Sequence, residues 1–336
     1  FADDEAFRLQ IDSYPELWQR TELCGEGHLM PTLFSRAIEA GGSYSKADAA
    51  QVIERAKQLN IEVMPEIEAL SHALAIGKVF PDMLDPEDTG TEESVQGYRH
   101  NILNPAMPKT WEVLTAIAKE VGDLFPFGHL HLGCDELPDG TWMNSPAARK
   151  VMDREGHKNT QDLQGWTMSK LAEIVTQNGQ RPAGWEEAAQ GSNGGIGHDA
   201  ILFSWSGKEP GFAAARAGYK VVMTPAQHIY LDMAHTDDLD DWGANWAAYV
   251  SLDDTIDWEP VPTDEPELEA NIIGVQGAFW AEFTTEDTQM WPMLLPRILG
   301  VSAMAWQSSQ MTSDALHALA RAYAPINGAF LAEFSD

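Results

Sequence analysis

Apolar positions along this chain recur with two different periods, one typical of helices and one typical of strands. Helical spacing predicts helices over 45–59, 106–122, 160–178, 209–217, 287–305 and 313–323. Shorter apolar runs bounded by Gly, Pro or Asn predict strands at 61–68, 125–133, 181–185, 200–205, 219–223 and 272–280. Because strands and helices alternate through the whole chain, we expect an α/β fold with a parallel sheet.

Polar and aromatic residues gather where most of these strands end. Counting a further strand end in the first residues, the ends fall near 2, 66, 133, 185, 205, 224 and 280. A (β/α)8 barrel places its active site at the carboxyl ends of its strands, whereas an open doubly wound sheet binds its ligand at one switch point. We therefore predict a (β/α)8 TIM-type barrel, with its first strand missing from this chain, formed as a single domain over residues 1–336.

Composition narrows the class of partner. The net charge is −31, from 52 acidic and 21 basic residues, which argues against nucleic acid. No apolar run is long enough to predict membrane insertion, and no signal peptide is visible. The histidines show no zinc-binding spacing, so we predict no metal and no cofactor. Two cysteines do not make a disulfide framework, and Cys24 and Cys134 are expected to be free thiols.

An acid pair, Asp135 and Glu136, follows the predicted strand that ends at Gly133. Adjacent carboxylates at a buried strand end repel each other and lose hydration, an arrangement typical of acids that take part in chemistry. The same pattern also fits a solvated strand end or a helix N-cap. The local pattern does not separate these interpretations.

Tryptophan is abundant, with 12 residues, and several lie beside polar residues at predicted strand ends: Trp185, Trp205, Trp246 and Trp280. Trp246 belongs to a long acidic and aromatic insertion over 233–271. Sugar rings stack their C–H faces on aromatic side chains and offer hydroxyls to carboxylates and amides. This combination favours a carbohydrate site.

The segment His131-Leu132-Gly133-Cys134-Asp135-Glu136 resembles the His-x-Gly-Gly-Asp-Glu signature of the glycoside hydrolase family twenty β-N-acetylhexosaminidases. The resemblance extends over nearly the whole chain. Further matches to the family's motifs, in the same order, are Ala2-Asp3-Asp4, the run 61–68 with His72, Gly184-Trp185-Glu186-Glu187, Tyr230-Leu231-Asp232 and Trp280-Ala281-Glu282.

The resemblance implies a retaining, exo-acting enzyme in which the substrate's own 2-acetamido oxygen attacks C1 and forms an oxazolinium intermediate. It implies that Glu136 is the acid and then the base, while Asp135 and Tyr230 orient the acetamide. The implied substrate is an oligosaccharide, such as a chitooligosaccharide or glycan, with a terminal non-reducing β-GlcNAc, GalNAc being a second option. A secreted or periplasmic location follows from the same resemblance, and the sequence leaves open whether the protein is a monomer or a homodimer.

The resemblance also assigns the supporting residues. It implies that Trp185, Trp205 and Trp280 wall the sugar pocket and that Trp246 stacks the next sugar. The other implied contacts are from Asp232 and Glu282 to sugar hydroxyls, and from Asp3 and His72 in a polar chain behind Glu136.

Three features depart from the family pattern. Cys134 replaces the second Gly of the signature, Ala2 replaces the Thr of the Thr-Asp-Asp motif, and no residue matches the Arg that ends the family's first strand. Two alternatives therefore stay open: a retaining glycosidase with an enzyme carboxylate as nucleophile, and a non-catalytic sugar-binding protein on a degenerate barrel.

Overall fold

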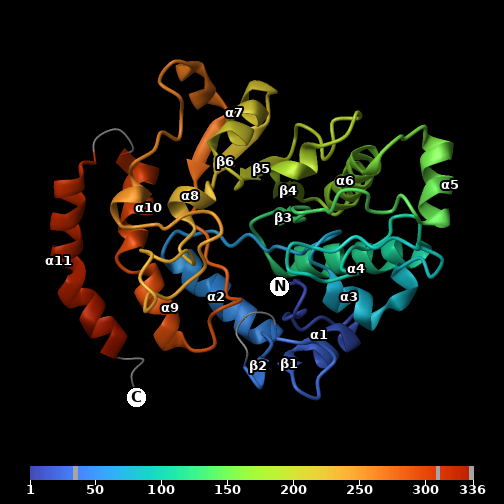
Figure 1. The fold of residues 1–336 in the computed structure, drawn as a ribbon, viewed down its shortest axis with the longest axis horizontal. Coiled ribbons are helices and arrows are strands. Elements are labelled where there is room, and N and C mark those ends of the chain that lie inside the picture. The colour runs from blue at the N-terminus through green and yellow to red at the C-terminus, as the bar shows by residue number, and fades with distance from the viewer. Residues whose placement is uncertain (33–36, 308–310, 333–336) are drawn as a thin grey trace. The chain divides into compact units, whose positions relative to one another are not determined.

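The computed structural model describes residues 1–32, 37–307 and 311–332, and the chain divides into two compact units (Figure 1). The first unit covers Phe1–Ile201 and the second covers Leu202–Asp336. Each unit is described by itself below. The expectation of a single domain stays a prediction.

In the first unit, strand β3 (His129–His131) pairs in parallel with β4 (Arg181–Trp185), with His129 opposite Arg181. The bounds of β4 match the prediction. The strand predicted at 61–68 is reduced to one parallel bridge between Glu66 and His131. The prediction was too long because Pro65 has no N–H to donate to a ladder, so its carbonyl alone takes part, accepting from the His131 N–H at 3.0 Å.

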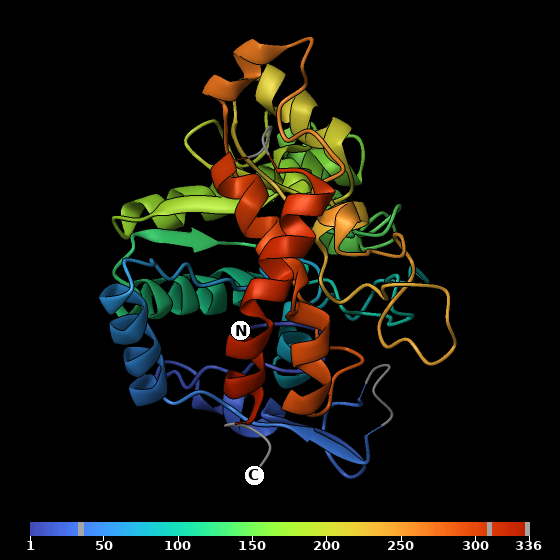
Figure 2. The ribbon, with the colours of Figure 1, turned by 90° about the vertical axis from the view of Figure 1, so that its left-hand side faces the viewer.

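Helices on the first unit follow the predicted apolar stripes. Helix α2 (Lys46–Gln58) begins at Ser45, whose side chain forms a capping box with Asp48. Helices α4 (Pro108–Leu124) and α6 (Thr160–Gln177) pack against each other, and Figure 2 shows α4 running alongside β3. Their buried faces include Val113, Leu114, Ile117, Val121, Leu163, Met168, Leu171 and Val175.

Several short elements of this unit were not predicted. They are α1 (Pro15–Thr21), β1 (Leu23–Gly25), β2 (Glu39–Gly41), α3 (Leu74–Val79), η1 (Pro81–Met83), α5 (Pro146–Glu155) and η2 (Glu186–Ala189). The helices among them span fewer than three turns and the strands only three residues each, too few for a hydrophobic period to be recognised in the sequence. Proline at the first turn marks α1 and α5, where its missing N–H costs nothing.

The second unit begins within β5 (Ile201–Ser204), and α7 (Lys208–Arg216) and β6 (Lys220–Met223) follow in the predicted order. Strand β6 pairs in parallel with β7, whose bounds are Ile272–Val275. The strand predicted at 272–280 therefore ends five residues early, and only an isolated bridge joins Tyr230 to Ala278 farther on. The remaining short elements are α8 (Ala226–Ile229), η3 (Asp253–Thr255) and η4 (Pro266–Ala270).

The helix predicted at 287–305 is two helices, α9 (Asp287–Leu294) and α10 (Arg297–Gln307). The prediction was wrong because Pro296 lacks the N–H that a continuous helix needs. Helix α11 (Ser313–Ala332) is longer than predicted and packs against α10, as Figures 1 and 2 both show. Within the described ranges, no helix is long and apolar enough to cross a membrane.

Arg297, at the start of α10, is fully buried and fixes the segment between α8 and η3. Its guanidinium donates to the carbonyl oxygens of Leu231, Met233 and Val250 at 2.6, 2.7 and 2.8 Å. A rigid fork of donors matches three carbonyls that the irregular backbone leaves without a ladder. The guanidinium thus holds in place the stretch that carries Tyr230 and Asp232.

Candidate active site

The acid pair of the first unit lies on a left-handed turn directly after β3. Gly133, Cys134 and Glu136 have φ angles of 63°, 84° and 53°. Gly133 is required on two grounds, since a side chain there would be strained and its Cβ would overlap the Glu68 carboxylate. Cys134 adopts the left-handed conformation without being glycine, so its neighbours must hold the turn in place.

His72 links the acid pair to a second pair of acids. Its Nε2 lies 3.3 Å from Oε2 of Glu136 and 3.5 Å from Oδ2 of Asp135, and its Nδ1 lies 3.4 Å from Asp4 Oδ2 and 3.7 Å from Asp3 Oδ1. Burial alone would lower the pKa of His72. The Asp135 carboxylate, with polar contacts to Asp135, Asp4 and Glu136, instead raises that pKa well above its usual value.

The cationic His72 therefore acts as a bridge between two anionic pairs. Asp4 is buried and also accepts from the Leu74 N–H at 3.1 Å and from the Asn101 side chain at 3.2 Å. Two sets of side chains, Asp3–Asp4–His72 and His72–Asp135–Glu136, are close enough to share a metal ion. A protonated imidazole has no lone pair to offer, and it supplies within the cluster the positive charge that a metal would bring.

The two acids of the turn differ in their partners. Glu136, with its side chain 20% exposed, accepts from Gln96 Nε2 at 3.3 Å. Asp135 is 14% exposed, and its Oδ1 is buried without a hydrogen-bond partner among the described residues. A buried carboxylate oxygen with no donor is costly unless a ligand supplies one. Asp135 is thus ready to accept an N–H or O–H from a bound molecule.

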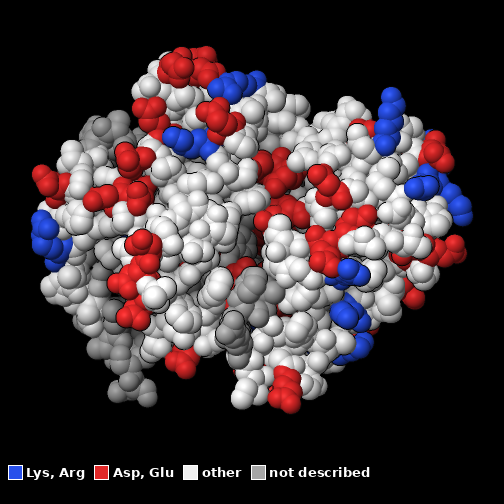
Figure 3. Space-filling view, viewed as in Figure 1, with Lys and Arg blue, Asp and Glu red and all other residues white. Residues whose placement is uncertain are grey.

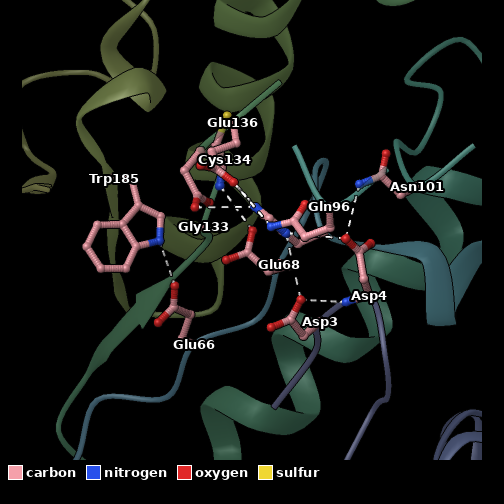
Figure 4. A network of polar contacts seen from close by, with 12 residues as sticks. Asp3, Asp4, Glu66, Glu68, Gln96, Asn101, Gly133, Cys134, Glu136 and Trp185 are labelled. Carbon is pink, nitrogen blue, oxygen red and sulfur yellow. Dashed lines mark hydrogen bonds and ion pairs between the residues drawn. The ribbon is translucent and has the colours of Figure 1, made fainter. Parts of the chain in front are cut away.

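Two further acids lie beneath the turn. Glu68 is buried and accepts from the Cys134 N–H at 3.2 Å. Burial first, and then the Asp135 and Glu66 carboxylates, raise the pKa of Glu68 well above its usual value, which favours the neutral acid. Glu66 accepts from Trp185 Nε1 at 2.9 Å, as Figure 4 shows, and lies 3.0 Å from His131 Nδ1.

Trp185 is buried, with its ring edge-on to that of His131 at a centroid distance of 5.0 Å. The predicted wall of a sugar pocket is therefore packed into the first unit and tethered to Glu66. Its contact with sugar stays a prediction.

The second unit brings together four predicted residues that are far apart in the sequence. The Tyr230 ring lies 5.9 Å from that of Trp246 and 6.2 Å from that of Trp280, while Trp205 lies 5.9 Å from Trp246. Tyr230 is buried, whereas Trp246 is 57% exposed. Perpendicular and tilted rings of this kind form an aromatic cluster, of which Trp246 is the exposed member.

Asp232 and Glu282 belong to the same unit. Asp232 is buried, and its Oδ1 has no hydrogen-bond partner within the described residues. Burial raises the pKa of Asp232 to about 7, against the lowering effect of nearby backbone N–H groups and of Arg297. Glu282 is half-buried, two residues after Trp280. Asp232 is thus a second buried acid with an acceptor to offer.

Comparison with known proteins identifies the family. The model of the glycosyl hydrolase family 20 catalytic domain matches residues 1–309. The chain belongs to glycosyl hydrolase family 20. Its relatives include a β-hexosaminidase of Vibrio furnissii, 33% identical over 89% of this chain and 49% of its own length, and a β-N-acetylhexosaminidase of Cellulomonas fimi, 28% identical over 92% of this chain and 56% of its own.

The fold agrees with the family. A family 20 exo-β-N-acetylglucosaminidase of Vibrio harveyi, solved in complex with N-acetylglucosamine, superposes with a TM-score of 0.90 at 30% identity, over 97% of this chain and 51% of that one. The predictions of family and of TIM-type barrel class are confirmed. This family 20 chain spans about half the length of the curated relatives it matches first.

Both cysteines of this family 20 chain are free, as predicted. The structure brings Asp3, His72, Asp135 and Glu136 together in one unit, and Tyr230, Trp205, Trp246 and Trp280 together in the other. Their roles toward substrate stay predictions. The sequence analysis placed Asp4 in a family motif without giving it a role, and it did not predict Gln96, Gln164 or Glu68 as site residues. Asp4 and Glu68 left a signal, since both lie in matched motifs, and alternate positions of a strand, here Glu66 and Glu68, point to one side.

Proposed function

We propose that the protein is an exo-acting β-N-acetylhexosaminidase that removes terminal non-reducing β-GlcNAc from oligosaccharides. One observation carries the proposal: the free, buried Oδ1 of Asp135 lies on the same turn as the partly exposed Glu136, with His72 behind both. An acceptor and a proton donor side by side are what an acetamido sugar needs. The names of the relatives and the bound N-acetylglucosamine of the Vibrio harveyi enzyme support it.

In the proposed first step, protonated Glu136 gives its proton to the glycosidic oxygen while the bond from that oxygen to C1 breaks. The acetamide oxygen forms the new bond to C1, and Asp135 Oδ1 accepts the acetamide N–H and stabilises the positive oxazolinium. Water then attacks C1, giving a proton to the Glu136 carboxylate, and the acetamide is released. A positioned acid of this kind contributes about 10²–10⁴-fold in rate.

The family resemblance adds Tyr230 as a hydrogen-bond donor to the acetamide oxygen, with Trp205, Trp280, Asp232 and Glu282 binding the sugar. Asp232 and the exposed ring of Trp246 provide the chemistry that such contacts require. Figure 3 shows more acidic than basic side chains on the visible face, which suits a neutral sugar better than a polyanion. We extend the proposal to a secreted or periplasmic location, where glycans of this type are found.

An enzyme carboxylate nucleophile is the second candidate mechanism. One oxygen of Asp135 and one of Glu136 are no farther than 4.8 Å apart, so two carboxyl groups lie at the same place. Enzymes that form a glycosyl-enzyme intermediate also use two nearby carboxyl groups, ~5–5.5 Å apart. Distance alone does not decide between the two mechanisms, but dependence on the acetamide does.

The test uses the full-length protein with p-nitrophenyl β-GlcNAc and p-nitrophenyl β-glucoside. We expect turnover of the GlcNAc substrate only, its loss in Glu136→Gln, and strong inhibition by a thiazoline that mimics the oxazolinium. Equal turnover of both glycosides would overturn substrate assistance. Binding of chitooligosaccharide by calorimetry without any turnover would instead support a sugar-binding protein.

A further inference from the structure

Gln164 is a buried polar side chain that no step of the proposed reaction uses. It lies on α6 and is 2% exposed. Its Nε2 lies 3.3 Å from the Cys134 carbonyl oxygen, 3.3 Å from the Glu187 carbonyl oxygen and 3.2 Å from Cys134 Sγ. The amide has two hydrogens for these three acceptors. Carbonyl oxygens accept more strongly than sulfur, so the hydrogens go to the two carbonyls, and the thiol packs alongside.

The contact from Gln164 to the Cys134 carbonyl matters because of its place along the turn. The turn is held at Gly133, whose carbonyl accepts from the Trp185 N–H at 3.1 Å, and at the Cys134 N–H, which donates to Glu68. The Cys134 carbonyl, held by Gln164, is the next group along the chain. In the described part of the chain, the backbone groups of Asp135 and Glu136 have no hydrogen-bond partner. The amide is therefore the last anchor before the two acids.

Gln164 is itself held in place by the close packing of α6 on the turn after β4. Glu187 belongs to η2, which follows β4 directly. Helix α6 packs closely on this region at Gly165, where an added Cβ would collide with the Gln190 carbonyl. Gln164 thus joins the turn after β3 to the turn after β4 from a helix that cannot shift easily.

The backbone conformation of Cys134 explains why the turn needs this hydrogen bond. A non-glycine residue at a φ of 84° resists the left-handed conformation, and relaxation of the backbone would swing Asp135 and Glu136 away from His72. Holding the carbonyl of that residue opposes such relaxation. The thiol fills the space against the Gln164 amide, and burial raises its pKa well above the usual range, which keeps it neutral there.

We propose that Gln164 is a positioning residue for the acid pair: its side-chain amide clamps the Cys134 and Glu187 carbonyls and so fixes the turn that aims Asp135 and Glu136. This inference rests on the proposed function, because it assigns an indirect role in the same reaction. Gln164 touches neither acid and is not itself a catalytic residue.

The test compares Gln164→Met, which keeps the length of the side chain and removes both donors, with Gln177→Met, the same change at an exposed position of α6. We expect Gln164→Met to lower kcat by about 10²-fold, as displacement of reacting groups by ~1 Å does, with KM changed far less. The pH profile of kcat should shift, because the two acids and His72 change their spacing. Gln177→Met should match the wild type in all three.

Hydrogen exchange of the Cys134 backbone amide, which donates to Glu68, provides a readout independent of activity. In folded Gln164→Met this amide should exchange at least tenfold faster than in the wild type. If kcat, its pH profile and the exchange rates all stay at wild-type values, the clamp is refuted, and lower thermal stability alone would also refute it. An inactive wild type would instead overturn the proposed function, while exchange would still test the clamp. Should Gln164→Met not fold, Gln164→Asn carries the same test, because its shorter amide cannot span both carbonyls.

Discussion

His72 Nε2 lies 3.3 Å from Oε2 of Glu136, while Nδ1 on the opposite side of the same ring lies 3.4 Å from the buried Asp4 carboxylate. Asp3, Asp135 and the buried Glu68 are the other acids near this ring. One buried imidazolium therefore neutralises parts of two acid pairs, and its protonation couples the proposed acid to the core of the first unit.

The first prediction concerns the pH dependence of this coupling. The pKa of His72 is raised in the folded protein, so as the pH rises the unfolded state loses this proton at a lower pH than the folded state does. The stabilisation should be complete below about pH 6.5, the usual pKa of histidine, and should be lost as the pH rises through the higher folded-state pKa. His72→Gln should lower the free energy of unfolding at pH 6 by about 3 kcal/mol, because it leaves buried carboxylates unpaired.

Urea unfolding between pH 6 and 10 measures this effect. The matched control is His28→Gln, which removes a histidine that also pairs with a carboxylate, Glu39, at a more open position. We expect the wild-type stability to decline toward alkaline pH and the His72→Gln curve to be flatter. If the free energy of unfolding of His72→Gln varied with pH in the same way as that of the wild type, His72 would be neutral in the folded protein.

The second prediction separates the two reasons why residue 133 must be glycine: its left-handed backbone conformation and the lack of space for a Cβ. Gly128 and Gly133 lie on either side of β3 with φ angles of 79° and 63°, but an added Cβ is unobstructed at Gly128 and overlaps the Glu68 carboxylate at Gly133. Gly128→Ala should cost about 1–2 kcal/mol for the left-handed conformation. Gly133→Ala should cost about 1–3 kcal/mol more, because Glu68 must move.

Denaturant unfolding of both alanine variants gives this difference directly. Gly133→Ala should also lower kcat, since Glu68 holds the Cys134 N–H, whereas Gly128→Ala should leave kcat unchanged. Equal costs for the two variants would mean that Glu68 adapts and does not define the turn.

The third prediction concerns Asp232. Its pKa is raised to about 7, so its contribution to stability should be complete below about pH 4, the usual range for aspartate, and should fall as the pH rises to about 7. The whole change amounts to at most about 4 kcal/mol. Asp232→Asn, which imitates the neutral acid, should remove this slope and be more stable than the wild type at pH 8.

Unfolding curves from pH 4 to 8 test this expectation, with Asp237→Asn as the control at an exposed position of the same segment. In the proposed function Asp232 accepts from a sugar hydroxyl, so Asp232→Asn should also raise KM. A slope that survives the substitution would place the titration on another group.

The sequence predicted the elements that local rules decide. The Ser45–Asp48 capping box fixes the start of α2, and Pro182 to Trp185 form a buried run that can only be a short strand. The motif around Asp135 and Glu136 identified the family because its residue types are constrained by chemistry. The prediction of one helix over 287–305 was wrong because Pro296 cannot donate the backbone hydrogen bond that a continuous helix needs.

The contacts that hold the site could not be predicted, for a physical reason. Asp4 reaches Asn101 across 97 residues, and Gln164 reaches Cys134 across 30. Gln and Asn at such positions are indistinguishable in sequence from exposed ones, since nothing local reveals that a helix face turns toward a strand end. Trp185 was likewise predicted to line an open sugar pocket, whereas the structure shows its ring packed against Glu66 and His131.

The last prediction concerns Trp246, whose exposed ring contacts Tyr230 and Trp205 edge-on. An aromatic face that stays open in the folded protein contributes little to stability and is available for stacking. Under the proposed function, Trp246→Ala should raise KM for chitotriose about fivefold, the equivalent of ~1 kcal/mol of lost stacking. KM for methyl β-GlcNAc, which has no second sugar, should not change. The control is Trp242→Ala, another exposed tryptophan of the same insertion, which should leave both constants and the melting temperature unaltered. If Trp246→Ala weakens both substrates equally, the ring supports the terminal-sugar pocket instead of a neighbouring subsite, and if it changes neither, the open face has no part in sugar binding.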